Sequence, residues 1–237
     1  MISISKKKLK NYFTVQKVHN VYSLNLSENT KPIYIKRPFV LDENVASLAG
    51  LMPDGSLIRD LMRIYFHQKK DLSKIELFND LVVELFSPKS TVLRKRDKSG
   101  QQIYINSKSL AWFFYYILKI PKSDEQMRVP RWIYKSPRKV KIAYLKQAFD
   151  MEGTILKKLT EIRFVSKDQL FAKDMKRLLK SLNIECHLTY APRNKQSSGQ
   201  YRVSIYRKEN FIKFKQIGFD ISSLKMRFNS LLEKYGI

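Results

Sequence analysis

Cysteine is nearly absent from this 237-residue sequence. The single Cys186 excludes an internal disulfide, and with three scattered histidines the chain offers no cysteine-rich zinc site. Seven glycines and eight prolines beside 43% hydrophobic residues leave enough apolar side chains for a core, so charge alone does not make the chain disordered. No apolar run approaches the roughly 20 residues that span a bilayer, and none follows the lysines near the N-terminus, so we expect neither a membrane protein nor a secreted one.

Acidic residues are also scarce. The 46 lysines and arginines outnumber the 21 acidic residues and give a formal net charge of +25. Residues 1–46 carry 8 basic and 3 acidic side chains, while residues 47–142 and 143–237 carry 19 basic and 9 acidic side chains each. The excess is therefore shared between two equally basic segments. Such a surface favours a polyanion, because neutralised phosphates release counterions; a generic lysine-rich surface is the alternative.

An internal repeat underlies these two segments. When Gly55 is aligned with Gly153, the stretches GSLIRDLMRIYFHQKKD and GTILKKLTEIRFVSKDQ run in parallel without a gap. Apolar residues coincide at Leu57/Ile155, Ile58/Leu156, Leu61/Leu159, Ile64/Ile162 and Phe66/Phe164. The polar pairs Arg59-Asp60 and Lys157-Lys158 interrupt both stretches at the same place. Each stretch is therefore predicted to form a β-hairpin with its turn there.

The segments behind the hairpins continue the repeat. Amphipathic helices are predicted at 72–86 and 170–182, and two further strands and a closing helix follow in each half. The predicted fold class is α+β, in which a unit of helix, strand, strand, helix, strand, strand, helix is used twice. The predicted domains are an N-terminal arm or extension at 1–40, a first repeat at 41–136 and a second repeat at 137–237. Whether the arm is rich in strands or leads into a helix stays open.

A helix precedes each hairpin and ends at an acidic residue. Asp42 is a predicted N-cap for the first helix, and Pro137 a predicted opener for the second. The helices end at Asp54-Gly55 and Glu152-Gly153, where we expect the glycine to adopt the left-handed turn that ends a helix. If the two helices pack side by side, the two carboxylates meet at one edge.

The two helix ends carry a family resemblance. SLAGLMPDGSL and YLKQAFDMEGTI resemble the two motifs of the monomeric LAGLIDADG homing endonucleases, the first in the style of archaeal introns and inteins. The likeness extends from about residue 40 to residue 237. It implies a pseudo-twofold αββαββα duplication whose two antiparallel sheets form a saddle for double-stranded DNA. It also implies a monomer that works in the cytoplasm of a prokaryote, at the nucleoid.

The resemblance also implies a metal site. In this family the last acidic residue of each motif binds the divalent metals that cleave DNA, which carries over to Asp54 and Glu152, with the adjoining Gly55 and Gly153. Two carboxylates at the negative ends of helix dipoles repel each other and call for a cation. Mg²⁺, or Mn²⁺ in its place, suits oxygen ligands and phosphate oxygens. Asp150 corresponds to an earlier acidic position with a structural or capping role.

Further catalytic positions follow from the resemblance. Gln68, fourteen residues after Asp54, resembles the polar residue that positions the attacking water, and its counterpart fourteen residues after Glu152 is Ser166. Serine is shorter than glutamine, so the second half departs from the family pattern at the water-positioning residue. Lys122 and Lys225 resemble the basic residue that each half places near the scissile phosphate, with Lys119 as a competitor to Lys122.

Strand alternation predicts which side chains face the DNA. Ile64, Phe66, Ile162 and Phe164, with Ile103, Ile105, Val203 and Ile205, are predicted to face the core. The residues predicted to face the groove are Arg63, Tyr65, Arg94, Arg96, Gln102, Tyr104, Glu161, Arg163, His187, Thr189, Arg193, Arg202, Ser204 and Tyr206. Arginine, glutamine, serine, threonine and tyrosine can hydrogen-bond base edges as well as phosphates, so this surface is suited to reading sequence.

The leading functional hypothesis is a site-specific double-strand DNA endonuclease of the homing type. The alternative is a LAGLIDADG protein that has lost cleavage and acts as an RNA maturase, an RNA-processing factor or a transcription factor, with RNA as a further partner. A basic structural or ribosome-associated protein would explain the charge but not the repeat. The Met1 start and the KYGI ending lack the splicing residues of an intein, so we expect a free-standing, intron-encoded enzyme.

Overall fold

The computed structural model describes residues 2–68, 71–87, 92–97, 100–192 and 199–237, with residues 92–97 described at the level of the backbone. The chain divides into two compact units, Met1–Glu125 and Gln126–Ile237. The residues 126–136 thus belong to the second unit, and the N-terminal extension belongs to the first. Among the described residues, no helix combines the length and the apolar character needed to cross a membrane.

Unit 1 begins with β1 (Ile2–Ile4), α1 (Lys6–Lys10), β2 (Thr14–Val18), β3 (Val21–Asn25), β4 (Ile33–Lys36) and β5 (Phe39–Leu41). It continues with α2 (Glu43–Leu51), the 3₁₀ turn η1 (Met52–Asp54), β6 (Gly55–Leu57), β7 (Arg63–Gln68), α3 (Ser73–Phe86), β8 (Val92–Asp97), β9 (Gly100–Asn106), α4 (Lys108–Trp112) and the π-helical turn η2 (Phe113–Leu118). The second part has the predicted order of one repeat.

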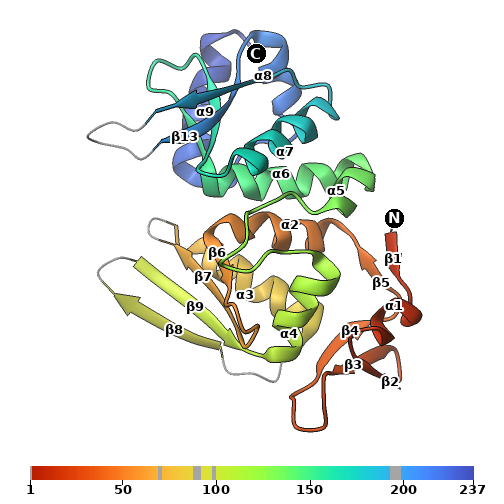
Figure 1. The fold of residues 1–237 in the computed structure, drawn as a ribbon. Helices are drawn as coiled ribbons and strands as arrows, with labels where there is room; N and C mark the ends of the chain where they lie inside the picture. Colours follow the sequence, from red (N-terminus) through yellow and green to blue (C-terminus); the bar gives the residue numbers. More distant parts are fainter. Residues whose placement is uncertain (1, 69–70, 88–91, 98–99, 193–198) are drawn as a thin grey trace. The chain divides into compact units, whose positions relative to one another are not determined.

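The main sheet of unit 1 is antiparallel, in the order β6-β7-β9-β8 (Figure 1). Ile64 of β7 lies opposite Ile105 of β9, and Phe66 opposite Ile103. All four side chains are fully buried, as alternation predicted. Phe78 of α3 stacks on Phe66 with ring centroids 4.7 Å apart, so α3 covers the apolar face of this sheet. The other face carries the alternate residues.

The N-terminal extension is a folded part of unit 1. Its strands form a three-stranded antiparallel sheet, β2-β3-β4, and a separate β1-β5 pair. Aromatic contacts attach it to the end of the repeat: Tyr12 stacks on Tyr116 at 4.7 Å, and Phe39 meets Phe113 edge to face at 5.1 Å. The extension therefore contains both strands and a short helix, and its apolar side chains join the core of the repeat.

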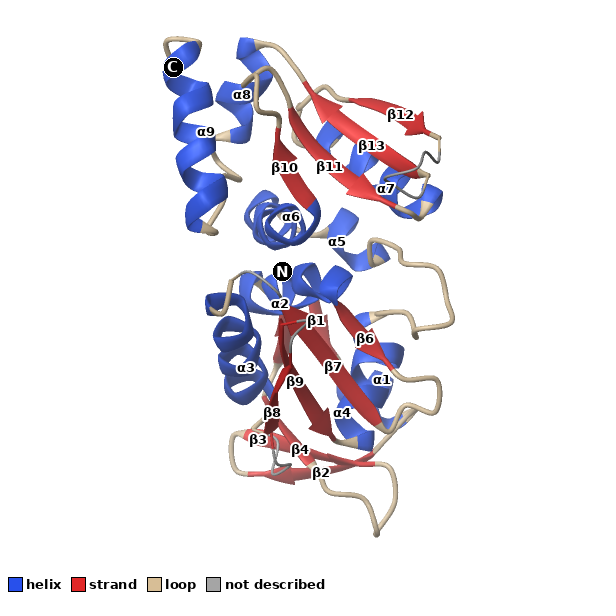
Figure 2. Ribbon diagram, turned by 90° about the vertical axis from the view of Figure 1, so that its left-hand side faces the viewer, coloured by secondary structure: helices blue, strands red, loops and turns tan. Residues whose placement is uncertain are grey.

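Unit 2 contains α5 (Arg131–Lys135), α6 (Arg138–Glu152), β10 (Gly153–Ile155), β11 (Ile162–Ser166), α7 (Gln169–Lys180), β12 (His187–Ala191), β13 (Gln200–Ile205), α8 (Lys208–Phe214) and α9 (Ser222–Lys234). Its sheet is antiparallel in the order β10-β11-β13-β12, and α7 covers one face of it (Figure 2). Helix α9 follows the predicted closing helix and lies outside the sequence prediction. It packs against β10.

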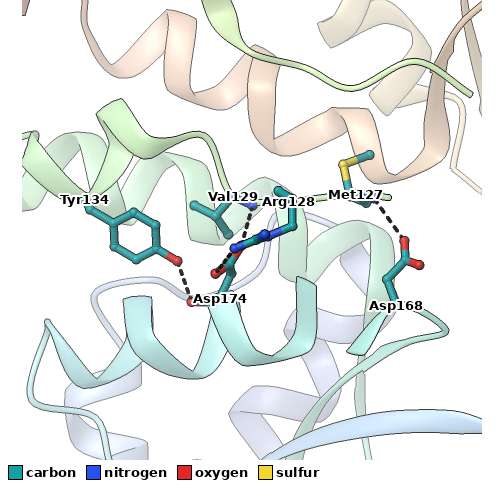
Figure 3. Close-up of polar contacts among 6 residues, drawn as sticks. All are labelled: Met127, Arg128, Val129, Tyr134, Asp168 and Asp174. Atoms are coloured by element: carbon teal, nitrogen blue, oxygen red, sulfur yellow. Dashed lines mark hydrogen bonds and ion pairs between the residues drawn. The ribbon is translucent and has the colours of Figure 1, made fainter. Parts of the chain in front are cut away.

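The first residues of unit 2 are fixed to α7 by polar contacts (Figure 3). The Arg128 guanidinium donates two hydrogen bonds to the Asp174 carboxylate, at 2.6 and 3.1 Å, and the Val129 amide donates a third at 3.3 Å. The Met127 amide donates to Asp168, the residue before α7, at 3.1 Å. Asp174 is only 5% exposed, so these bonds satisfy a buried carboxylate and hold the incoming chain against α7.

The two hairpins of the repeat have the same turn. In unit 1 the Leu61 amide donates to the carbonyl of Ile58 at 2.9 Å, and in unit 2 the Leu159 amide donates to the carbonyl of Leu156 at 2.9 Å. The two leucines have positive φ values of 55° and 51°. Arg59-Asp60 and Lys157-Lys158 occupy the turn in each case, which confirms the predicted hairpins.

Candidate active site and nucleic-acid interface

Asp54 stands at the end of the first motif helix. The Asp42 carboxylate caps the start of α2 by accepting from the Val45 amide at 3.1 Å, and the helix tightens into η1 before β6 begins. The Gln68 side-chain amide, at the end of β7, donates a hydrogen bond to the Asp54 carboxylate. Gln68 is 8% exposed, so the pair lies at the edge of the core. The structure thus brings together two of the predicted catalytic residues.

The environment of Asp54 disfavours its charge. Burial raises the pKa of this carboxyl to about 6, and the hydrogen bond from Gln68 and the nearby His67 oppose the rise only in part. Near neutral pH the group is ionised but poorly solvated. A carboxylate in this condition gains from a cation at close range.

The glycines after the two acids are not left-handed. Gly55 has φ −103° and Gly153 has φ −88°, both in the extended region, so the expected left-handed turn is wrong at both helix ends. Each glycine instead passes directly from the helix into the first strand of its hairpin. Neither position has room for a side chain. A Cβ on Gly153 would lie 2.1 Å from the backbone oxygen of Phe149, and a Cβ on Gly55 would lie 2.7 Å from the flexible Met52 side chain.

These contacts predict different costs for the same substitution. Gly153→Ala must displace backbone and is expected to destabilise unit 2 by about 2 kcal/mol or more, whereas Gly55→Ala moves only the end of a methionine and should cost less than about 1 kcal/mol. Urea unfolding of the two variants beside the wild type measures both. Equal losses of unfolding free energy in the two variants would show that the contacts of the added Cβ do not explain why glycine stands at these positions.

Glu152 ends α6 at the position that matches Asp54. The counterpart of Gln68 is Ser166, whose hydroxyl accepts a hydrogen bond from the Asp168 amide at 3.0 Å. This bond uses one lone pair of the hydroxyl in the turn that opens α7. The two units therefore differ in residue type and in hydrogen bonding at the second predicted catalytic position.

Asp150 has the structural role that the resemblance implies. Its buried carboxylate accepts hydrogen bonds from the backbone amides of Asp220 at 3.1 Å and Ile221 at 3.5 Å, just before α9. Lys146 and Gln147 of α6 bind the Asp220 side chain, each at 3.1 Å. The motif helix is thus tied to the start of α9, the helix that carries Lys225.

The three lysines of the prediction differ in their surroundings. Lys122 forms a parallel bridge with Leu57, three residues after Asp54, and the amide of Ser123 donates to the Leu57 carbonyl at 2.8 Å. Lys225 is exposed in the first turns of α9. Lys119 is the left-handed residue, φ 63°, that ends η2 and is exposed. Of the two residues that compete in unit 1, Lys122 is the one that adjoins the strand after Asp54.

The polar face of the unit 1 sheet is organised around Arg63. Its guanidinium donates to the Tyr65 hydroxyl at 2.8 Å and to the Asn106 side-chain oxygen, and it lies 5.3 Å from the centre of the Tyr104 ring. Asn106 and His67 share the face with the predicted set, and the same alternation along β9 and β7 could have identified them. Gln102 lies opposite His67. Arg94 and Arg96 lie in β8, and their side chains are outside the described part of the chain.

The polar face of the unit 2 sheet is built on a buried acid. Arg163 donates two hydrogen bonds to Glu161, at 2.7 and 2.9 Å, and Ser204 donates a third. Glu161 and Ser204 are 3% and 2% exposed, so the Arg163 guanidinium is held by a buried carboxylate. Burial by itself would raise the pKa of Glu161, but the hydrogen bonds from Arg163 and Ser204 outweigh it and lower that pKa.

The other described residues of unit 2 that were predicted to face the groove lie in β12 and β13, with Tyr206 directly after β13. Thr189 and Arg202 are cross-strand partners in β12 and β13, and His187 lies 6.0 Å from the ring of Tyr206. Tyr206 is 39% exposed. Arg193 is outside the described residues. Among the described residues no group of three or more histidine, cysteine or acidic side chains is placed to hold a metal ion.

Comparisons with known proteins agree with the repeat. Residues 139–218 match the family model of the LAGLIDADG-like domain. The curated protein "Probable translation initiation factor IF-2" of Methanocaldococcus jannaschii is 25% identical over 248 aligned residues. That match covers 96% of this chain but 20% of the relative, so the chain spans about a fifth of the relative's length.

Solved structures share the fold. I-DmoI in complex with DNA and Ca has a TM-score of 0.53 at 22% identity, over 73% of this chain and 87% of that one. Variants of the homing endonuclease I-DmoI have a TM-score of 0.54 at 20% identity, over 75% and 96%. Full-length DUF199/WhiA from Thermatoga maritima has a TM-score of 0.53 at 13% identity, over 84% and 62%. Residues 139–218 therefore form a LAGLIDADG-like domain, and the chain has the fold of the LAGLIDADG homing endonucleases.

Proposed function

We propose that the protein is a site-specific, metal-dependent double-strand DNA endonuclease of the homing type. The observation that carries this proposal is the Asp54–Gln68 pair, in which a partly buried carboxylate at the end of a motif helix is hydrogen-bonded to a buried amide. Glu152 occupies the equivalent helix end in unit 2. Asp54 and Glu152 then supply one metal-binding carboxylate per unit, and a monomer is sufficient for both strands.

The residues present suit a hard divalent cation. I-DmoI has been crystallised with DNA and Ca, Mn or Mg. The candidate site here offers carboxylate oxygens, and burial raises the pKa of Asp54 to about 6, so its charge is poorly solvated. Mg²⁺ uses few protein ligands and keeps waters and phosphate oxygens, so a site with a single protein carboxylate suits it. When bound, the ion would supply Lewis-acid chemistry and a more acidic water.

The chain's own groups have separate tasks in this proposal. Asp54 and Glu152 each hold a divalent cation at the end of their motif helix, beside Gly55 and Gly153. Gln68 orients the attacking water beside Asp54. Ser166 is shorter than Gln68, and its oxygen already accepts a hydrogen bond in the turn before α7, so unit 2 orients its water less firmly. Lys122 and Lys225 neutralise charge on the phosphate. I-DmoI variants solved with DNA carry substitutions at a glutamate, at a glutamine together with a lysine, and at a glycine, the same residue types.

The two sheets provide the contacts to a long recognition site. Arg63, Tyr65 and Tyr104 form one held cluster on unit 1, and Arg163, supported by Glu161, forms another on unit 2. An arginine fixed in this way loses little side-chain entropy when it binds a base, and a bidentate contact contributes about 1 to 3 kcal/mol of discrimination. In this proposal the two sheets therefore contact base edges as well as phosphates.

A second candidate function is a DNA- or RNA-binding protein without cleavage. The likeness of the fold to WhiA and the engagement of Ser166 favour it. Incubation of the purified chain with Mg²⁺ or Mn²⁺ and a plasmid library of randomised sites separates the two. We expect double-strand cleavage at one class of site. Specific binding to such a site, with no cleavage in either metal, would establish the binding protein instead.

A further inference from the structure

Lys122 belongs to a small cluster on unit 1 whose other members, Glu125 and Tyr115, have no part in the proposed chemistry so far. Its ammonium lies 3.5 Å from the Glu125 carboxylate and 5.2 Å from the centre of the Tyr115 ring. The Tyr115 hydroxyl donates to the same carboxylate at 2.8 Å. The Lys122 side chain is only 23% exposed, so its apolar stem is covered even though it carries a charge.

The geometry fixes the carboxylate more firmly than the ammonium. One oxygen of Glu125 accepts from Tyr115, and the other accepts from the Lys122 backbone amide at 3.2 Å. The Glu125 amide in turn donates to the Lys122 carbonyl at 3.0 Å and closes a tight turn. At 3.5 Å the ammonium is attracted by the carboxylate, but the distance exceeds that of an ordinary hydrogen bond. Its three donors can still reach an incoming phosphate oxygen.

The cluster stands beside the strand that leaves the candidate metal site. Lys122 and Ser123 pair with Leu57, and the 3₁₀ turn that ends at Asp54 directly precedes that strand. An ion pair elsewhere on the surface would contribute little, because long exposed side chains lose entropy when they are fixed. Here the ring, the turn and the strand bridge fix the base of the side chain before the charges interact.

We propose that Glu125, with Tyr115, is a positioning residue that holds the Lys122 ammonium for the scissile phosphate. The inference rests on the proposed nuclease function. In the DNA-free protein the pair restricts the rotamers of Lys122, and the DNA phosphate completes the coordination of the ammonium. Glu125 touches neither DNA nor metal in this proposal, and its whole effect passes through Lys122.

A double-mutant cycle tests this dependence. Single-turnover cleavage of the selected site with Mg²⁺ should be about tenfold slower in Glu125→Gln, with the affinity for DNA within about twofold of the wild type. Lys122→Met should be slower still. Adding Glu125→Gln to Lys122→Met should change nothing further, because the group that Glu125 positions is gone. Glu125→Asp keeps the charge and should recover part of the rate.

Matched controls use the neighbouring residues. Asp124→Asn removes the same charge one position earlier, from a carboxylate that pairs with Arg59 at 3.4 Å, and should leave the rate unchanged. Tyr115→Phe should slow cleavage, and Tyr116→Phe, on a ring that stacks with Tyr12, should not. An equal loss from Glu125→Gln in the wild-type and Lys122→Met backgrounds would overturn the positioning role, as would faster cleavage by Glu125→Gln. If the wild type cleaves no DNA, the nuclease function itself is refuted, and the inference falls with it.

Discussion

Asp54→Asn and Glu152→Gln are each expected to lower the rate of double-strand cleavage at least about 1000-fold while the affinity for the DNA site stays within about threefold of the wild type. Both substitutions keep the shape and the hydrogen-bonding oxygen of the side chain. They remove the negative charge that a divalent cation requires. DNA affinity comes from the sheet faces and the basic surface, which neither substitution changes.

The measurement separates binding from chemistry. Affinity is determined by fluorescence anisotropy with Ca²⁺, and cleavage by single-turnover assays in Mg²⁺ and Mn²⁺. Asp60→Asn is the matched control, because it makes the same change in the exposed turn of the same hairpin, where Asp60 accepts from the Met62 amide at 3.0 Å. A cleavage rate for Asp54→Asn equal to that of the wild type would show that Asp54 is not a metal ligand. A loss of binding as large as the loss of cleavage would point to misfolding or to a direct DNA contact.

Asp150→Asn provides a second comparison from the same helix as Glu152. The Asp150 carboxylate accepts from the backbone before α9 and is 3% exposed. Its replacement is expected to reduce the stability of unit 2, and to affect cleavage only through the position of α9. Comparison of Asp150→Asn with Glu152→Gln thus distinguishes a structural role from a catalytic one, although the two acids stand two residues apart in α6.

The repeat could be predicted because each half repeats the same local rules. Period-two burial at Ile64 and Phe66 and at Ile162 and Phe164 recurs with an unchanged spacing to the turn and to the acid-glycine pair. Each hairpin pattern is weak by itself, but the agreement between the two halves fixes the predicted register of both. The pairing of Gln68 with Asp54 follows from this register, since Gly55 lies opposite Phe66 and the last residue of β7 reaches back to the helix end.

Other features depend on contacts that no local pattern records. The extension pairs Ile2 with Leu41 and packs Tyr12 on Tyr116, so its fold is fixed by residues far apart in the chain. Alternation predicted that Glu161 and Ser204 face the groove, but it could not show that both are buried or that Arg163 and Ser204 hydrogen-bond to Glu161. The glycine error has the same origin: the composition signals a special backbone, whereas the structure requires space beside Phe149.

Asp54→Asn is also expected to stabilise the protein near neutral pH. Burial raises the pKa of Asp54 from 3.8 to about 6 in the folded state. A carboxyl with a raised pKa costs nothing below the unfolded value, because it is neutral in both states. The cost grows as the pH rises from about 4 to about 6, and it is complete above that. Asparagine carries no charge at any of these pH values and still accepts from Gln68, so it avoids the cost.

The expected gain at pH 7.5 is about 2 to 3 kcal/mol, the equivalent of the pKa shift, and it should nearly vanish at pH 4. Urea unfolding of wild type and Asp54→Asn at the two pH values, without divalent metal, measures it, with Asp60→Asn as the control that should show no such difference. Mg²⁺ or Mn²⁺ should then stabilise the wild type and not Asp54→Asn, because the bound cation supplies the charge compensation that the buried carboxylate lacks. A gain independent of pH would assign the effect to packing, and equal stabilisation of both proteins by metal would place the cation elsewhere. The expected pattern would show that the residue needed for cutting is kept at the expense of stability.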